Sequence, residues 1–152
     1  MNYNKITKPT ECRLIVAMAD IACFGKACQG KSNLDTFRML DEFYHLIDSV
    51  VTGAGGKVLK FIGDAALMVF PGDHAKEVVA LLQSLKKEAQ AIWTEFDVKC
   101  TVCIKAHIGS VVCGPMGAEK RFDVIGDTLN ELFRMPDGHE LSDELKALVE
   151  EM

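Results

Sequence analysis

Two aspartates stand where apolar segments of the sequence end, and both positions suit the binding of a metal ion. Asp64 interrupts the run LKFIGDAALMVF at residues 59–70, and Asp20 follows an apolar segment that reaches Met18. Removing an unpaired carboxylate from water costs several kcal/mol or more. A divalent cation shared by the two carboxylates would satisfy both and relieve the repulsion between them.

Such a pair predicts chemistry on a phosphate ester. Mg²⁺ prefers few protein carboxylates together with phosphate oxygens and water. Two bound ions can activate an attacking hydroxyl and offset charge on a leaving phosphate. The pair therefore indicates a metal–nucleotide site. Simpler interpretations stay open, because Gly-Asp is a common turn pair and Asp20 could cap a helix.

The strands that must hold the two aspartates follow from the hydrophobic pattern. We expect a buried strand that ends at Asp20 and a hairpin of strands 58–62 and 65–70, whose two-residue turn is Gly63-Asp64. The segments 98–109 and 110–117 predict two further strands. If the first strand is the neighbour of the hairpin, the two carboxylates meet at one edge of the sheet.

Two long amphipathic helices are predicted between these strands. Apolar residues recur at steps of three and four in 34–50 and again in 78–96. Ser32 or Asn33 can cap the first of these helices.

The rest of the chain predicts a helix from Thr128 and a final helix capped by Ser142. The resulting order is βαββαββα. It indicates an α+β fold, a ferredoxin-like or palm-type βαββαβ sheet with helices mainly on one face, in a single domain spanning residues 1–152.

Charge and composition exclude several classes of function. The 152 residues carry a net charge of −5 without a dense Lys/Arg block, which argues against a nucleic-acid or anionic-membrane surface. The polar N-terminus lacks the layout of a signal peptide, and the apolar runs are shorter than the ~20 residues of a membrane span. We expect a soluble, cytoplasmic protein.

The six cysteines lie mostly in apolar segments and are expected to be reduced core thiols. Cys100 and Cys103 form one CxxC pair without a second at zinc-finger spacing, so a zinc or redox site has little support.

Three motifs, in order, resemble those of the class III nucleotidyl cyclase catalytic domain. MADIACFGKAC is similar to the family segment that supplies a first metal-binding Asp. LKFIGDAALMVF is similar to its Lys-x-x-Gly-Asp hairpin, and RFDVIGDTLNELFRM to its Asp-x-x-Gly-x-x-x-Asn-x-x-x-Arg signature. An ordered set with matching internal spacing is more specific than any single motif.

The resemblance implies a role for eight positions. The ligands of two Mg²⁺ or Mn²⁺ ions would be Asp20, Asp64 and the carbonyl of Ile21. The substrate-binding residues would be Lys60, Asp123 and Phe24. The residues that orient the ribose and stabilise charge on the transferring phosphate would be Asn130 and Arg134, which a helix places on one face.

The base-reading pair favours adenine. Lys60 donates to a ring nitrogen and Asp123 accepts from an exocyclic amine, whereas guanine presents a carbonyl at that position. Each residue also has an ordinary structural interpretation: a solvated strand lysine, a turn acid, a helix cap for Asn130, and a surface ion pair of Arg134 with Glu131 or Asp127.

The resemblance therefore implies an adenylate cyclase that converts ATP to 3′,5′-cyclic AMP and pyrophosphate. Family sites form between two subunits, which implies a head-to-tail homodimer. One alternative is a catalytically impaired cyclase-like module for nucleotide binding or dimerisation. A palm-type enzyme that makes a dinucleotide fits less well, because such enzymes lack the Asn-x-x-x-Arg helix.

The sequence departs from the family pattern in three places. Cys23 stands where a Gly is usual, and a side chain there can crowd the triphosphate. Leu132 and Phe133 replace small residues before Arg134. The family continues into a β-hairpin whose Lys contacts the triphosphate, whereas this sequence stops at Met152, so we expect a cyclase domain without that hairpin.

Overall fold

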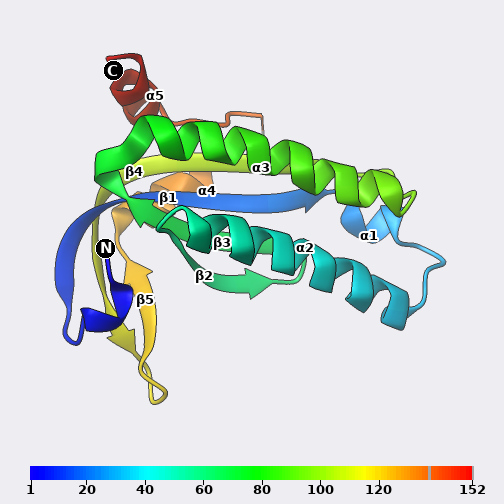
Figure 1. Ribbon diagram of the computed structural model, residues 1–152, viewed down its shortest axis with the longest axis horizontal. Coiled ribbons are helices and arrows are strands. Elements are labelled where there is room, and N and C mark those ends of the chain that lie inside the picture. Colours follow the sequence, from blue (N-terminus) through cyan, green and yellow to red (C-terminus); the bar gives the residue numbers. More distant parts are fainter. Residues whose placement is uncertain (137, 152) are drawn as a thin grey trace.

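The computed structural model describes residues 1–136 and 138–151 and is built on a five-stranded antiparallel sheet with the order β2-β3-β1-β4-β5 (Figure 1). The strands are β1 (Thr10–Ala22), β2 (Lys57–Ile62), β3 (Ala65–Pro71), β4 (Thr101–Met116) and β5 (Arg121–Ile125). The helices are α1 (Phe24–Ala27), α2 (Asn33–Gly53), α3 (Ala75–Glu95), α4 (Asp127–Arg134) and α5 (Asp143–Glu150). Short 3-10 turns cover Tyr3–Lys5 and Gly72–His74.

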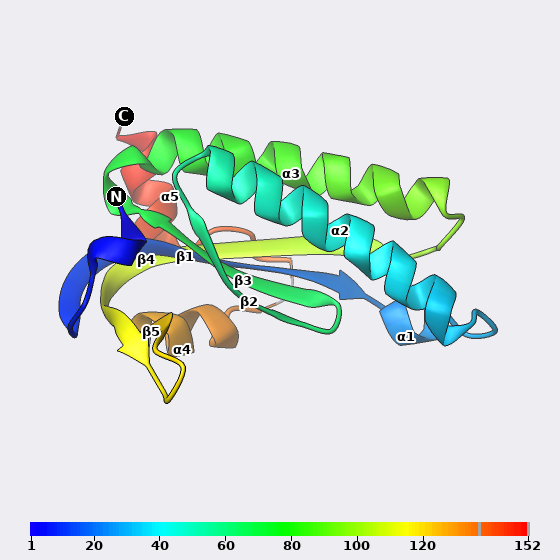
Figure 2. The ribbon, with the colours of Figure 1, turned by 60° about the horizontal axis from the view of Figure 1, so that its bottom comes forward.

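The sheet has a hydrophobic core on each face. Helices α2 and α3 lie on one face and α4 on the other (Figure 2). Side chains alternate along β1, so that Ile15 and Ile21 enter the core under α2 and α3, whereas Leu14 and Val16 enter the smaller core that α4 covers. By the same alternation, Asp20 lies on the α4 side of the sheet.

The α+β fold predicted from the sequence is confirmed. The hairpin of β2 and β3 has the Gly63-Asp64 turn, and both predicted N-caps are formed: Ser32 Oγ accepts from Asp35 N at 3.1 Å and Ser142 Oγ from Leu145 N at 3.2 Å. The helices lie mainly on one face, with α4 as the exception. No helix in 1–136 or 138–151 is long and apolar enough to cross a membrane.

Three strand predictions were wrong in detail. The segments 98–109 and 110–117 form one strand, β4, because Gly109 does not end a strand but permits close packing. A Cβ at that position would lie 2.4 Å from Thr128 Oγ1 on α4. Strand β5 was not predicted, since its five residues include the acidic Asp123. Strand β1 continues past Asp20 to Ala22.

The two edge strands of the sheet approach one another. Strands β1 and β4 bend together at one end, where β5 pairs with β4 (Figure 1). As a result β5 contacts β2, although the two strands stand at opposite ends of the sheet order. Aromatic and aliphatic side chains of both strands, Leu59 and Phe122, pack against the core on the α4 side.

Candidate active site

Strand pairing places the two candidate metal ligands at the same end of neighbouring strands. Ala19 of β1 is paired with Ala66 of β3. Asp20 is the next residue along β1, and Asp64 lies two residues before Ala66 in the hairpin turn, so both carboxylates are at one end of the β1–β3 pair. Both residues are half-buried.

The hairpin turn that carries Asp64 is fixed to α2 by Tyr44. The Tyr44 hydroxyl donates a hydrogen bond to the Gly63 carbonyl, and the Tyr44 ring stacks on Phe61 with centroids 4.0 Å apart. Gly63 has a φ of 57°, a conformation that favours glycine. Burial, together with the negative charge of Asp64, raises the pKa of Tyr44 above its ordinary value.

The donor set suits a hard divalent cation. In 1–136 and 138–151 no three His, Cys, Asp or Glu side chains are grouped so that they could hold a metal. The predicted set does not need three, because Mg²⁺ binds through one or two carboxylates and completes its shell with water and substrate phosphates. Asp20, Asp64 and the Ile21 carbonyl supply oxygen atoms only, which fits such an ion.

The two candidate base-reading side chains meet within one chain. Lys60 Nζ on β2 lies 3.2 Å from Asp123 Oδ2 on β5, and Asp123 Oδ1 accepts a hydrogen bond from Val124 N at 2.9 Å. The Lys60 and Asp123 side chains are 45% and 28% exposed. Ion pairs this exposed contribute little to stability. A ligand can therefore replace the contact between the two side chains at a small cost in free energy.

Asn130 and Arg134 lie on the exposed side of α4. Within the described residues neither side chain makes a hydrogen bond or an ion pair, so the surface pairs considered for Arg134 are not formed there. Glu131 instead pairs with His107. The neighbouring Leu132 is buried in the core on the α4 side and thus points away from the exposed face.

The segment between β1 and α1 has an unusual backbone. Cys23 is exposed and adopts a left-handed conformation with φ 62° and ψ 25°, a geometry that explains why glycine would be usual there. Phe24 follows, and its ring packs edge-on against Trp93 with centroids 5.4 Å apart. The Phe24 ring therefore contacts the core.

Two polar residues of this region were not predicted from the sequence. Tyr44 lies within a helical face of apolar residues and has no motif of its own. His107 is a single histidine in an alternating strand, and its buried position under α4 and α5 depends on the fold. The one signal in the sequence is that each polar side chain stands at a position where the pattern predicts an apolar one.

Comparisons with known proteins agree with the motifs. Residues 7–141 match the family described as the adenylate and guanylate cyclase catalytic domain. The chain is 29% identical over 118 residues to the photoactivated adenylate cyclase subunit beta of Euglena gracilis; the match covers 72% of this chain and 14% of that protein, so the chain spans a small part of its relative.

Solved structures show the same fold. The adenylyl cyclase CyaB from P. aeruginosa superposes with a TM-score of 0.85 at 16% identity, covering 95% of this chain and 84% of that one. The guanylyl cyclase Cya2 gives a TM-score of 0.80 at 20% identity, with 93% and 80% covered. At these identities the similarity establishes the fold, and it includes cyclases of both base specificities.

Proposed function

The chain belongs to the adenylate and guanylate cyclase catalytic domain family, and from this premise we propose that it is an adenylate cyclase that converts ATP to 3′,5′-cyclic AMP and pyrophosphate. The observation that carries the adenine assignment is the 3.2 Å approach of Lys60 to Asp123. A donor beside an acceptor matches the ring nitrogen and the amine of adenine, whereas guanine would leave Asp123 facing a carbonyl.

In the proposed mechanism the phosphates bind near the end of β1. Asp20 and Asp64 would hold two divalent ions. When bound, such ions would neutralise charge on the phosphates and lower the pKa of the attacking hydroxyl. Asn130 orients the ribose so that its 3′ oxygen faces the α-phosphorus. Arg134 donates to the α-phosphate oxygens, where negative charge builds up in the transition state.

The covalent change is a single displacement. The bond between the 3′ oxygen and the α-phosphorus forms while the bond from that phosphorus to the bridging oxygen of the β-phosphate breaks. Pyrophosphate then leaves with the electron pair of the broken bond. The proton of the 3′ hydroxyl passes to solvent or to a phosphate oxygen.

We place the site between two copies of the chain arranged head to tail. Asn130 and Arg134 are exposed on α4 and have no side-chain partner in 1–136 or 138–151, as expected of residues that act across an interface. Each copy carries both a metal-binding set and a base-reading set, so a homodimer would have two equivalent sites.

A cyclase-like module that binds nucleotide without turnover is the second candidate. The observation that favours it is Cys23, which is exposed at the start of α1, two residues after Ile21. A side chain at that position can crowd the triphosphate and hold it short of the geometry needed for displacement, and a misplacement of about 1 Å can lower a rate ~100-fold.

Incubation of the purified protein with Mn²⁺ and ATP distinguishes the candidates. We expect cyclic AMP from the wild-type chain and at least a 100-fold loss in Asp64→Asn, which removes a charged metal ligand. The matched control Asp73→Asn changes an exposed aspartate whose one ion pair in 1–136 and 138–151 is with His74, and this variant should retain activity. ATP binding without product in every variant would support the module and contradict the enzyme.

A further inference from the structure

Helix α4 depends on the rest of the fold for its orientation. It has eight residues, and its N-cap is Gly126, which provides no side-chain cap. Isolated helices shorter than about 12 residues are marginal in water. Its apolar anchors are Leu129 and Leu132. Any residue that fixes α4 against β4 therefore also fixes Asn130 and Arg134.

Polar contacts from β4 hold α4 at both ends. At the N-terminal end Thr128 Oγ1 donates to the Ser110 carbonyl at 2.7 Å. At the C-terminal end Lys105 Nζ donates to the carbonyls of Phe133 at 3.3 Å and Met135 at 3.1 Å. These contacts set the position of the helix along β4, but they involve its ends rather than its sides.

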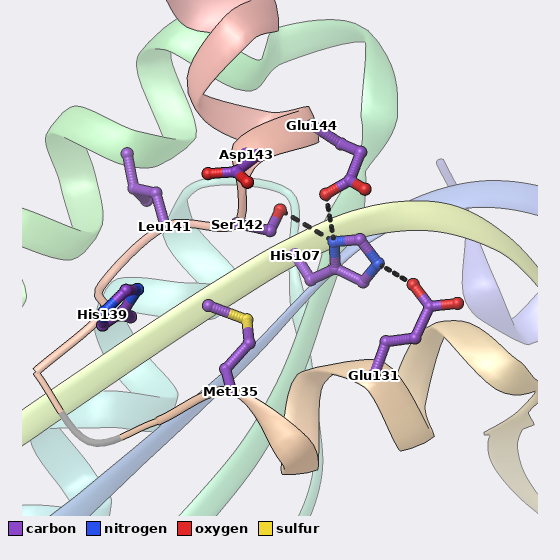
Figure 3. Close-up of a pocket in the computed structure, with 8 residues that line it drawn as sticks. All are labelled: His107, Glu131, Met135, His139, Leu141, Ser142, Asp143 and Glu144. Carbon is purple, nitrogen blue, oxygen red and sulfur yellow. Dashed lines mark hydrogen bonds and ion pairs between the residues drawn. The ribbon is translucent and has the colours of Figure 1, made fainter.

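A third contact lies between these two and acts on the side of the helix. His107 of β4 points between α4 and the N-terminus of α5 (Figure 3). Its Nε2 is 2.7 Å from Glu131 Oε2, and its Nδ1 is 2.7 Å from Ser142 Oγ. The His107 side chain is only 5% exposed, so both ring nitrogens obtain their partners from the protein.

The partners determine the tautomer of His107. A carboxylate accepts but does not donate, so Nε2 carries the proton that is donated to Glu131. With the ring neutral, Nδ1 accepts from the Ser142 hydroxyl, whose oxygen in turn accepts from Leu145 N at 3.2 Å. One directed series of hydrogen bonds thus runs from the start of α5 through β4 to α4, and each bond polarises the next.

We propose that His107 and Glu131 are positioning residues that set the rotation of α4 about its axis, and so the aim of Asn130 and Arg134 at the substrate. This inference rests on the proposed function. Successive helical residues are rotated by roughly 100°. Glu131 therefore lies on the flank of the face that Asn130 and Arg134 share, where a tether resists rotation of the helix.

The alternative is that the contact only adds stability. Partly exposed ion pairs contribute little to the free energy of folding, and Glu131 is 51% exposed. A purely stabilising contact would leave KM unchanged and would lower the apparent kcat only in proportion to the loss of folded protein, which circular dichroism measures. A positioning contact would lower kcat at constant KM for ATP, because it affects an interaction made in the transition state.

Three variants of the full chain test the proposal. Glu131→Leu removes the acceptor, Glu131→Gln keeps an acceptor oxygen for Nε2, and Glu144→Leu changes the glutamate of α5 that lies farther from the same ring, at 3.8 Å from Nδ1. We expect kcat to fall at least 10-fold in Glu131→Leu with KM within twofold. Glu131→Gln should stay within threefold of wild type, and Glu144→Leu within twofold.

Amide hydrogen exchange provides a readout that does not need activity. Residues 127–135 should exchange at least fivefold faster in Glu131→Leu than in wild type, with α2 and α3 unchanged. Unchanged exchange in 127–135, or an equal loss of activity in Glu131→Gln, would overturn the positioning role. A wild-type chain without cyclase activity would instead overturn the proposed function, while the exchange result would still decide whether His107 and Glu131 orient α4.

Discussion

Lys60 and Asp123 form an ion pair of 3.2 Å although their strands occupy opposite edges of the sheet. The pair exists because β1 and β4 bend together and bring β5 against β2. Two residues that are 63 positions apart in the sequence thereby present a donor and an acceptor side by side. The proposed choice of adenine depends on this arrangement.

Changing the acceptor of this pair should weaken discrimination between bases. Asp123→Asn keeps an oxygen that accepts from the amine of adenine but adds an amide group that can donate to the carbonyl of guanine. We expect the ratio of kcat/KM for ATP to that for GTP to fall about 10-fold. Steady-state kinetics with both nucleotides measures it, and a ratio within twofold of wild type would contradict a base-reading role for Asp123.

Removal of the Tyr44 hydroxyl should loosen the hairpin turn that carries Asp64. Tyr44→Phe leaves the Gly63 carbonyl without its donor, which should lower the free energy of unfolding by about 1 kcal/mol. Because the turn holds Asp64, the Mn²⁺ concentration for half-maximal activity should rise at least threefold. Metal titration of the cyclase reaction gives this value.

A second tyrosine provides the matched control for that variant. The Tyr3 hydroxyl donates to the Gly55 carbonyl at 2.9 Å, a contact of the same kind that lies away from the hairpin turn. Tyr3→Phe should lose a similar amount of stability and leave the Mn²⁺ requirement unchanged. An equal shift of the Mn²⁺ requirement in both variants would show that the effect is a general loss of stability.

Glycine at position 23 should stabilise the fold. The left-handed conformation of Cys23 costs a non-glycine residue roughly 1–2 kcal/mol, and the greater backbone entropy of glycine in the unfolded chain offsets roughly 0.5–1 kcal/mol of this. Cys23→Gly should therefore raise the free energy of unfolding, measured by urea denaturation, by about 0.5–1 kcal/mol. Cys28→Gly, at a φ of −95°, should lower it, and a loss in both variants would contradict the strain at Cys23.

A methyl group on Gly109 should displace α4. In Gly109→Ala the new Cβ would lie 2.4 Å from Thr128 Oγ1, and overpacking of this kind costs about 1–3 kcal/mol. Adding Thr128→Ala removes the closest atom and should recover part of the loss in thermal unfolding. Gly53→Ala, where a Cβ meets nothing within 4 Å, is the control and should be at least as stable as wild type.

The parts of the fold that follow from local sequence were predictable. Apolar residues at steps of three and four predicted both long helices, and the Gly63-Asp64 pair predicted the hairpin turn. Ser32 and Ser142 cap their helices because a hydroxyl just before a helix accepts from its free backbone N–H groups. The order of the three motifs predicted the cyclase family, and the match over residues 7–141 confirms it.

The parts that depend on contacts between distant segments were not predictable. A glycine such as Gly109 suggests the end of a strand unless its packing against Thr128 is known. The five residues of β5 pair with residues 112–116 of β4, a contact that only the fold brings about. Tyr44 and His107 acquire their roles from backbone and side-chain partners that are between 19 and 35 positions away. No local pattern records such partners.

The unbroken course of β4 constrains how this domain can change during evolution. Lys105, His107 and Ser110 contact α4 or α5, and Gly114 pairs with Asp123. A single inserted or deleted residue between Lys105 and Gly114 would reverse which side of the sheet the later side chains face. Length variation among descendants of this sequence should accordingly avoid β4 and accumulate in the connections between elements.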